Sequence, residues 1–77
     1  MNIKVYSTDW CSDCITVKKF LKSQGVLFEE ININNNIQAT DFVERVNNGK
    51  RIIPTIDIDG KIYVNPGINT LMKIIKE

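Results

Sequence analysis

Residues 3–14 read IKVYSTDWCSDC, and they carry the strongest structural signal in the chain. The stretch begins with β-branched and aromatic residues, which are typical of a strand. From Cys11 onward the apolar spacing becomes that of a helix, because Cys14 and Leu21 share one face. This helix should end near Gln24. Cys11 is therefore predicted at the junction where a strand gives way to a helix.

The two cysteines of the chain, Cys11 and Cys14, are separated by two residues, and the chain has no histidine. A structural zinc site needs four Cys or His ligands, so this chain alone is not expected to build a metal site. A disulfide across two residues closes a very small loop and removes little entropy from the unfolded chain, which disfavours a purely stabilising bridge. The pattern favours redox chemistry by a pair of thiols.

Outward from this stretch, a second strand is expected at about residues 27–31, followed by the Asn-rich run 32–36. That run could be a plain turn or a recognition loop, and we favour the turn because Asn adopts turn conformations readily. Ala39 and Val43 lie on one face of a second predicted helix, which should end before Gly49.

The remainder of the chain predicts a hairpin and a last helix. The apolar-rich run 53–58 is followed by Asp-Gly at 59–60, a strong two-residue hairpin signal, and residues 61–64 supply the returning strand. An apolar stripe from Ile68 to Ile75 then has helical spacing, and we interpret it as core.

The predicted order of elements is βαβαββα. The first two strands should be parallel because a helix crosses between them, whereas the last two should form an antiparallel hairpin. We predict an α/β protein with a four-stranded mixed sheet flanked by helices, which resembles the smallest thioredoxin-like layout. Residues 1–77 should form a single domain, since 77 residues of which 43% are hydrophobic suffice for one modest core.

Composition restricts the partners and the location. The formal net charge is only +1, so no basic surface suited to nucleic acid is expected. No stretch approaches the roughly 20 apolar residues of a membrane span, and the first residues lack the features of a signal peptide. We therefore expect a soluble, cytoplasmic protein that acts as a monomer without nucleic acid or membrane.

The two thiols are expected to play different parts. The first amides of a helix and its dipole place partial positive charge beside Cys11, which favours a thiolate there. Cys14 lies one turn further along, on the inward face, where it can resolve a mixed disulfide formed at Cys11. Asp13 either opposes the thiolate by its charge or simply stabilises the first helical turn.

Several motifs resemble the glutaredoxin family, and the resemblance extends over nearly the whole chain. YSTDWCSDC at residues 6–14 is similar to the active-site segment of that family, and RIIPT at 51–55 is similar to its Arg-Thr-Val-Pro segment. The mycoredoxin-type branch is the most similar, through Trp10-Cys11, through VNNGKR at 46–51 and through Asn-Pro at 65–66.

The resemblance implies a thioredoxin-like fold, a nucleophilic Cys11 and a resolving Cys14. It further implies a cis peptide bond before Pro54, and a substrate-binding surface that includes Ile53, Pro54, Thr55 and Asn65. Trp10 could anchor a partner or pack against the helix, and we favour docking because loop aromatics beside reactive groups often anchor partners.

We expect a dithiol thiol–disulfide oxidoreductase that reduces protein disulfides or mixed disulfides with a small thiol and needs no organic cofactor. The reductant could be glutathione, another small thiol or a flavoprotein reductase. Thr8 and residues 65–69 depart from the pattern with which glutaredoxins hold glutathione. An alternative is an iron–sulfur binding module, in which two copies share a cluster through Cys11 and external thiols complete the ligands.

Overall fold

The computed structural model describes residues 1–76, and Glu77, the last residue of the expected domain, lies outside them. Strands and helices follow the predicted order βαβαββα. Their bounds are β1 (Ile3–Ser7), α1 (Ser12–Ser23), β2 (Glu29–Asn32), α2 (Ile37–Val46), β3 (Thr55–Ile58), β4 (Lys61–Val64) and α3 (Ile68–Ile75). No helix within residues 1–76 is long and apolar enough to cross a membrane.

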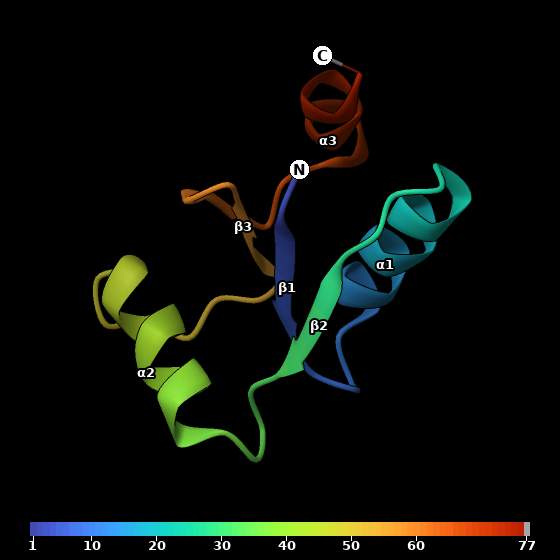
Figure 1. The fold of residues 1–77 in the computed structure, drawn as a ribbon. Helices are drawn as coiled ribbons and strands as arrows, with labels where there is room; N and C mark the ends of the chain where they lie inside the picture. The colour runs from blue at the N-terminus through green and yellow to red at the C-terminus, as the bar shows by residue number, and fades with distance from the viewer. Residues whose placement is uncertain (77) are drawn as a thin grey trace.

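The four strands form one mixed sheet in the order β2-β1-β3-β4. β1 pairs with β2 in parallel and with β3 antiparallel, and the β3–β4 hairpin turns at Asp59 and Gly60. Both turn residues have positive φ angles, 51° and 91°, which the tight hairpin turn requires and which Asp-Gly tolerates well. α1 and α3 cover one face of the sheet and α2 covers the other (Figure 1). This confirms the predicted thioredoxin-like fold.

A buried apolar cluster lies on each face of the sheet, because alternate residues of a strand point to opposite faces. On the α1 and α3 side, Ile3 and Val5 of β1 pack with Leu21 and Leu71. On the α2 side, Tyr6 packs in a cluster of buried residues whose other members are Ile33, Ala39 and Val43. The two clusters fix the sheet between its helices and so fix the position of the β1–α1 junction.

Two strands begin later than predicted. β2 starts at Glu29 because Val26 still caps α1, its amide donating to the Leu21 carbonyl, and Leu27 is left 90% exposed. β3 starts at Thr55 because Pro54 has no N–H with which to join the ladder.

Within the Asn-rich run 32–36, residues 33–35 form a turn, and Asn36 is the N-cap residue of α2. The side chain of Asn36 accepts a hydrogen bond from the Ala39 amide at 3.0 Å, which satisfies one of the free amides at the helix start. The first residue of the run, Asn32, instead belongs to β2 and faces the β1–α1 loop.

Candidate functional site

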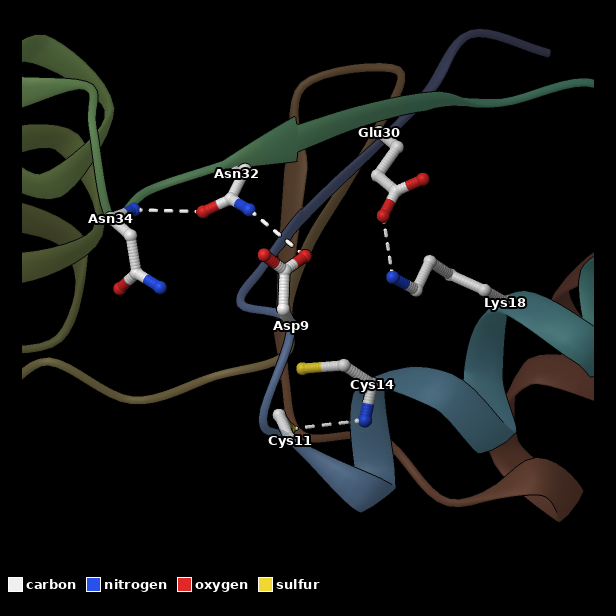
Figure 2. A network of polar contacts seen from close by, with 7 residues as sticks. All are labelled: Asp9, Cys11, Cys14, Lys18, Glu30, Asn32 and Asn34. Atoms are coloured by element: carbon white, nitrogen blue, oxygen red, sulfur yellow. Dashed lines mark hydrogen bonds and ion pairs between the residues drawn. The ribbon is translucent and has the colours of Figure 1, made fainter.

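Cys11 is the N-cap residue of α1. Its backbone is extended, with φ −95° and ψ 110°, and its Sγ accepts a hydrogen bond from the Cys14 amide at 3.1 Å (Figure 2). The Cys11 carbonyl also accepts from the Ile15 amide at 3.1 Å, so the residue is held at both its backbone and its side chain. The partly exposed Cys11 thus lies at the positive end of the helix dipole, beside the amide groups of the first turn of α1.

Cys14 differs from Cys11 in its burial. Its side chain is 0% exposed, and both cysteines are free thiols. Burial, followed by a hydrogen bond with the Cys11 side chain, raises the pKa of the Cys14 thiol to about 12, while a backbone hydrogen bond with Thr8 and the Lys18 ammonium act in the opposite direction. Near neutral pH the reduced Cys14 is therefore a protonated, enclosed thiol.

The loop between β1 and α1 is tied to the end of β2 by side-chain amides. Asn32 Nδ2 donates to Asp9 Oδ1 at 3.1 Å, and Asn32 Oδ1 accepts from the Asn34 amide at 2.9 Å (Figure 2). Asn32 was not among the residues predicted for the site. It could have been found, because β1 and β2 are parallel and residues that follow parallel strands meet at one edge of a sheet.

The Ile53–Pro54 peptide bond is cis, as the resemblance implied. The β1–β3 register pairs Tyr6 with Thr55, so Pro54 lies beside Ser7, close to the point where the cysteine loop leaves β1. Pro54 is fully buried, and its carbonyl accepts from the Asn65 amide at 2.7 Å. The structure therefore brings the proline segment and the loop after β4 to the same edge of the sheet as the cysteines.

The hydroxyl of Thr55 is committed to an internal network. It donates to the Ile52 carbonyl at 2.7 Å and accepts from Asn47 Nδ2 at 3.2 Å, and the same Asn47 nitrogen donates to the Val43 carbonyl at 2.7 Å. Since Thr55 is fully buried, its side chain fixes the proline segment to the end of α2. The partly exposed Ile53 remains on the outer side of this segment.

Trp10 and the start of α3 complete the surroundings of Cys11. Trp10 is 86% exposed, so the alternative in which it packs against α1 does not apply. A shallow groove runs between the start of α1, at Asp13 and Thr16, and the loop 65–67 that precedes α3. In the described part of the chain, no three His, Cys, Asp or Glu side chains are grouped so that they could hold a metal ion.

The fold and the site define a small protein of the thioredoxin-like class with a Cys-x-x-Cys pair at the first strand–helix junction. Comparison with known proteins narrows this class. Residues 3–63 match the family model described as Glutaredoxin, and the chain belongs to the glutaredoxin family. Thiol oxidoreductase chemistry is a property of this family.

The relatives include a Mycobacterium tuberculosis protein whose name assigns it to the glutaredoxins, 33% identical over 96% of this chain and 90% of its own length. Mycoredoxin 1 of Corynebacterium glutamicum is 36% identical over 84% of this chain and 81% of its own length. Among solved structures, the thioredoxin-like protein BC3987 superposes with a TM-score of 0.83 at 29% identity, covering 94% of this chain and 97% of that one.

Proposed function

We propose that this protein is a dithiol thiol–disulfide oxidoreductase in which Cys11 attacks the substrate and Cys14 resolves the adduct. The observation that carries the proposal is the asymmetry of the two sulfurs. One is half-exposed and accepts an amide hydrogen bond at the start of α1, and the other is fully enclosed one turn later. Membership of the glutaredoxin family supports the same chemistry.

The reaction begins when the Cys11 thiolate attacks one sulfur of a substrate disulfide. A mixed disulfide forms at Cys11, the substrate S–S bond breaks, and the departing thiolate takes up a proton. Cys14 then loses its proton and attacks Cys11 Sγ, which forms the Cys11–Cys14 disulfide and releases the second substrate thiol. Two electrons have passed from the two cysteines to the substrate.

The surroundings of Cys11 indicate how a substrate is received. We infer that Trp10, Ile53 and Asn65 form the surface against which a disulfide-bearing partner lies. The buried Pro54 supports this surface, because its place beside Ser7 and its hydrogen bond with Asn65 bring the segment to the cysteine edge. The substrates would be protein disulfides or mixed disulfides with a small thiol. The oxidised pair would be reduced again by a small thiol or by a flavoprotein reductase.

The test compares Cys11→Ser with Cys14→Ser. We expect Cys11→Ser to abolish disulfide reduction, because the exposed nucleophile is lost. Cys14→Ser should still take up one substrate equivalent and remain trapped as a mixed disulfide, since no second thiol is left to release it. Mass spectrometry of the intact protein and of its peptides would locate the adduct.

An adduct on Cys14 in the Cys11→Ser variant, formed as fast as the Cys11 adduct, would contradict the assignment of roles. Turnover measured in parallel with glutathione, with another small thiol and with a flavoprotein reductase would identify the reductant.

A further inference from the structure

An ion pair lies on the same side of α1 as the resolving cysteine. Lys18 follows Cys14 by four residues, which places the two side chains one above the other on a helix. The ammonium of Lys18 pairs with the carboxylate of Glu30, on β2, and the Lys18 side chain is only 14% exposed. In Figure 2 the Cys14 and Lys18 side chains leave α1 toward Asp9 and Glu30.

The second step of the proposed reaction needs such a charge. Cys14 is enclosed, so water has poor access to the sulfur and cannot solvate the negative charge that develops when the proton leaves. A nearby cation that is itself held in place can lower this penalty. At the positive end of α1, the backbone amide of Cys14 donates a hydrogen bond to Cys11 Sγ at 3.1 Å. This hydrogen bond stabilises negative charge on Cys11 and not on Cys14.

The other charged groups around Cys14 do not supply this charge. In the mixed disulfide that is being resolved, Cys11 carries no charge. Asp13 and Asp9, which is held by Asn32, are acidic, and Glu30 on the neighbouring strand is acidic as well. A backbone hydrogen bond with Thr8 lowers the pKa of the Cys14 thiol, and Lys18 is the cation that also does so.

We propose that Lys18 is a positioning residue for the resolution step: its ammonium, fixed by Glu30 on the side of α1 that Cys14 also occupies, favours the thiolate that attacks the mixed disulfide at Cys11. The inference rests on the proposed function. In the step it assists, the Cys14 proton leaves, the Cys14–Cys11 S–S bond forms, and the substrate thiolate departs from Cys11 and is protonated. Lys18 itself forms no covalent bond and transfers no electron.

The experiment separates the resolution step from the attack that precedes it. The reduced protein is mixed with an equivalent of dithiodipyridine, a neutral disulfide, in a stopped-flow instrument. Release of the first thiopyridone reports attack by Cys11, and release of the second reports displacement by Cys14. The rate of the second phase is measured across a range of pH for the wild type, for Lys18→Met and for Lys18→Gln.

Lys18→Met is expected to slow the second phase by about 3- to 10-fold near neutral pH and to move its pH midpoint upward by about half a unit to one unit, with the first phase little changed. Lys18→Gln should shift the midpoint in the same direction, because it removes the charge but keeps a polar side chain at this position. Lys18→Arg keeps the charge and should restore most of the rate.

Two neighbours supply matched controls. Lys19→Met removes the same charge from the exposed side of α1, and Glu29→Gln removes a negative charge from the exposed residue that precedes Glu30. Both are expected to leave the pH profile of the second phase unchanged.

If Lys18→Met and Lys19→Met gave the same pH profile as the wild type, the role of Lys18 would be refuted while the dithiol reaction stood. A wild type that released a single thiopyridone would instead refute the proposed function itself. If Lys18→Met did not fold, Lys18→Gln would still decide the matter, since an unchanged midpoint in that variant would overturn the proposal.

Discussion

The enclosed thiol of Cys14 links the stability of the reduced protein to pH. Burial, then the interaction with Cys11, raises the pKa of this thiol from 9.0 to about 12. Below pH 9 both the folded and the unfolded chain keep the proton, so the full stability is present. Between these two values the unfolded chain loses the proton first, and stability declines as pH rises toward the pKa of the folded state.

We expect the free energy of unfolding of the reduced protein to fall above pH 9 by at most about 1.4 kcal/mol per pH unit more than in Cys14→Ser. The variant lacks the titrating thiol and keeps every other group, including Tyr6, whose pKa is also raised, chiefly by burial. Urea denaturation in the presence of a reductant would measure both proteins. Parallel pH profiles would show that Cys14 does not carry this effect.

Among the helices, α2 shows how one side chain sets where an element begins. Asn36 caps the helix by accepting the Ala39 amide at 3.0 Å, and Asn34, two residues earlier, is exposed and caps nothing. Asn36→Ala should reduce the free energy of unfolding by about 1 kcal/mol, since one helix amide loses its partner. Thermal denaturation followed by circular dichroism would measure the loss.

The matched control for the cap is Asn34→Ala, in which the donating backbone amide is retained. It should change stability by less than about 0.5 kcal/mol. A similar loss in both variants would mean that the whole turn, and not the Asn36 cap, sets the start of the helix.

Local signals explain why most elements could be predicted from the sequence. The β-branched and aromatic residues of β1, the helical stripe of α1 and the Asp-Gly turn are each encoded within a few residues, and each was found at its predicted place. The predicted start of β2 was wrong because the apolar residue Leu27 fits the strand pattern, although it lies in the loop after α1.

Contacts between distant residues could not be predicted in the same way. Lys18 and Glu30, which form an ion pair, are 12 residues apart in the sequence, and Asp9 and Asn32, which form a hydrogen bond, are 23 residues apart. Both contacts depend on the parallel register of β1 and β2 and on how α1 lies against them. The pair of cysteines was visible in the sequence, and the predicted parallel strands could have placed Asn32 beside the loop after β1, whereas the Lys18–Glu30 ion pair required the fold.

For the molecule as a whole, the small size of the protein makes its two apolar clusters critical. A domain of this length has few buried side chains to lose, and typical domains are stable by only about 5–15 kcal/mol. Leu71 of α3 is fully buried in the cluster that also contains Leu21 of α1. The last helix is therefore part of the core that holds the cysteine helix in place.

Leu71→Ala is expected to cost about 2–5 kcal/mol, because a cavity would open between α3 and the sheet. Leu27→Ala is the matched control, since it makes the same chemical change at a side chain that is 90% exposed, and it should cost less than about 0.5 kcal/mol. Urea denaturation of both variants gives the comparison. Equal losses would mean that burial of Leu71 does not contribute as the packing indicates.

The hydrogen bond from the Cys14 amide to Cys11 Sγ also gives a spectroscopic signal for the state of the sulfur. The chemical shift of that amide proton depends on how strongly the sulfur accepts the hydrogen bond. When the sulfur passes from a free thiolate to one half of a disulfide, it becomes a poorer acceptor, and the resonance of the amide proton responds. A nitrogen–proton correlation spectrum can therefore follow the arrival and departure of any partner at Cys11 without a label on the partner.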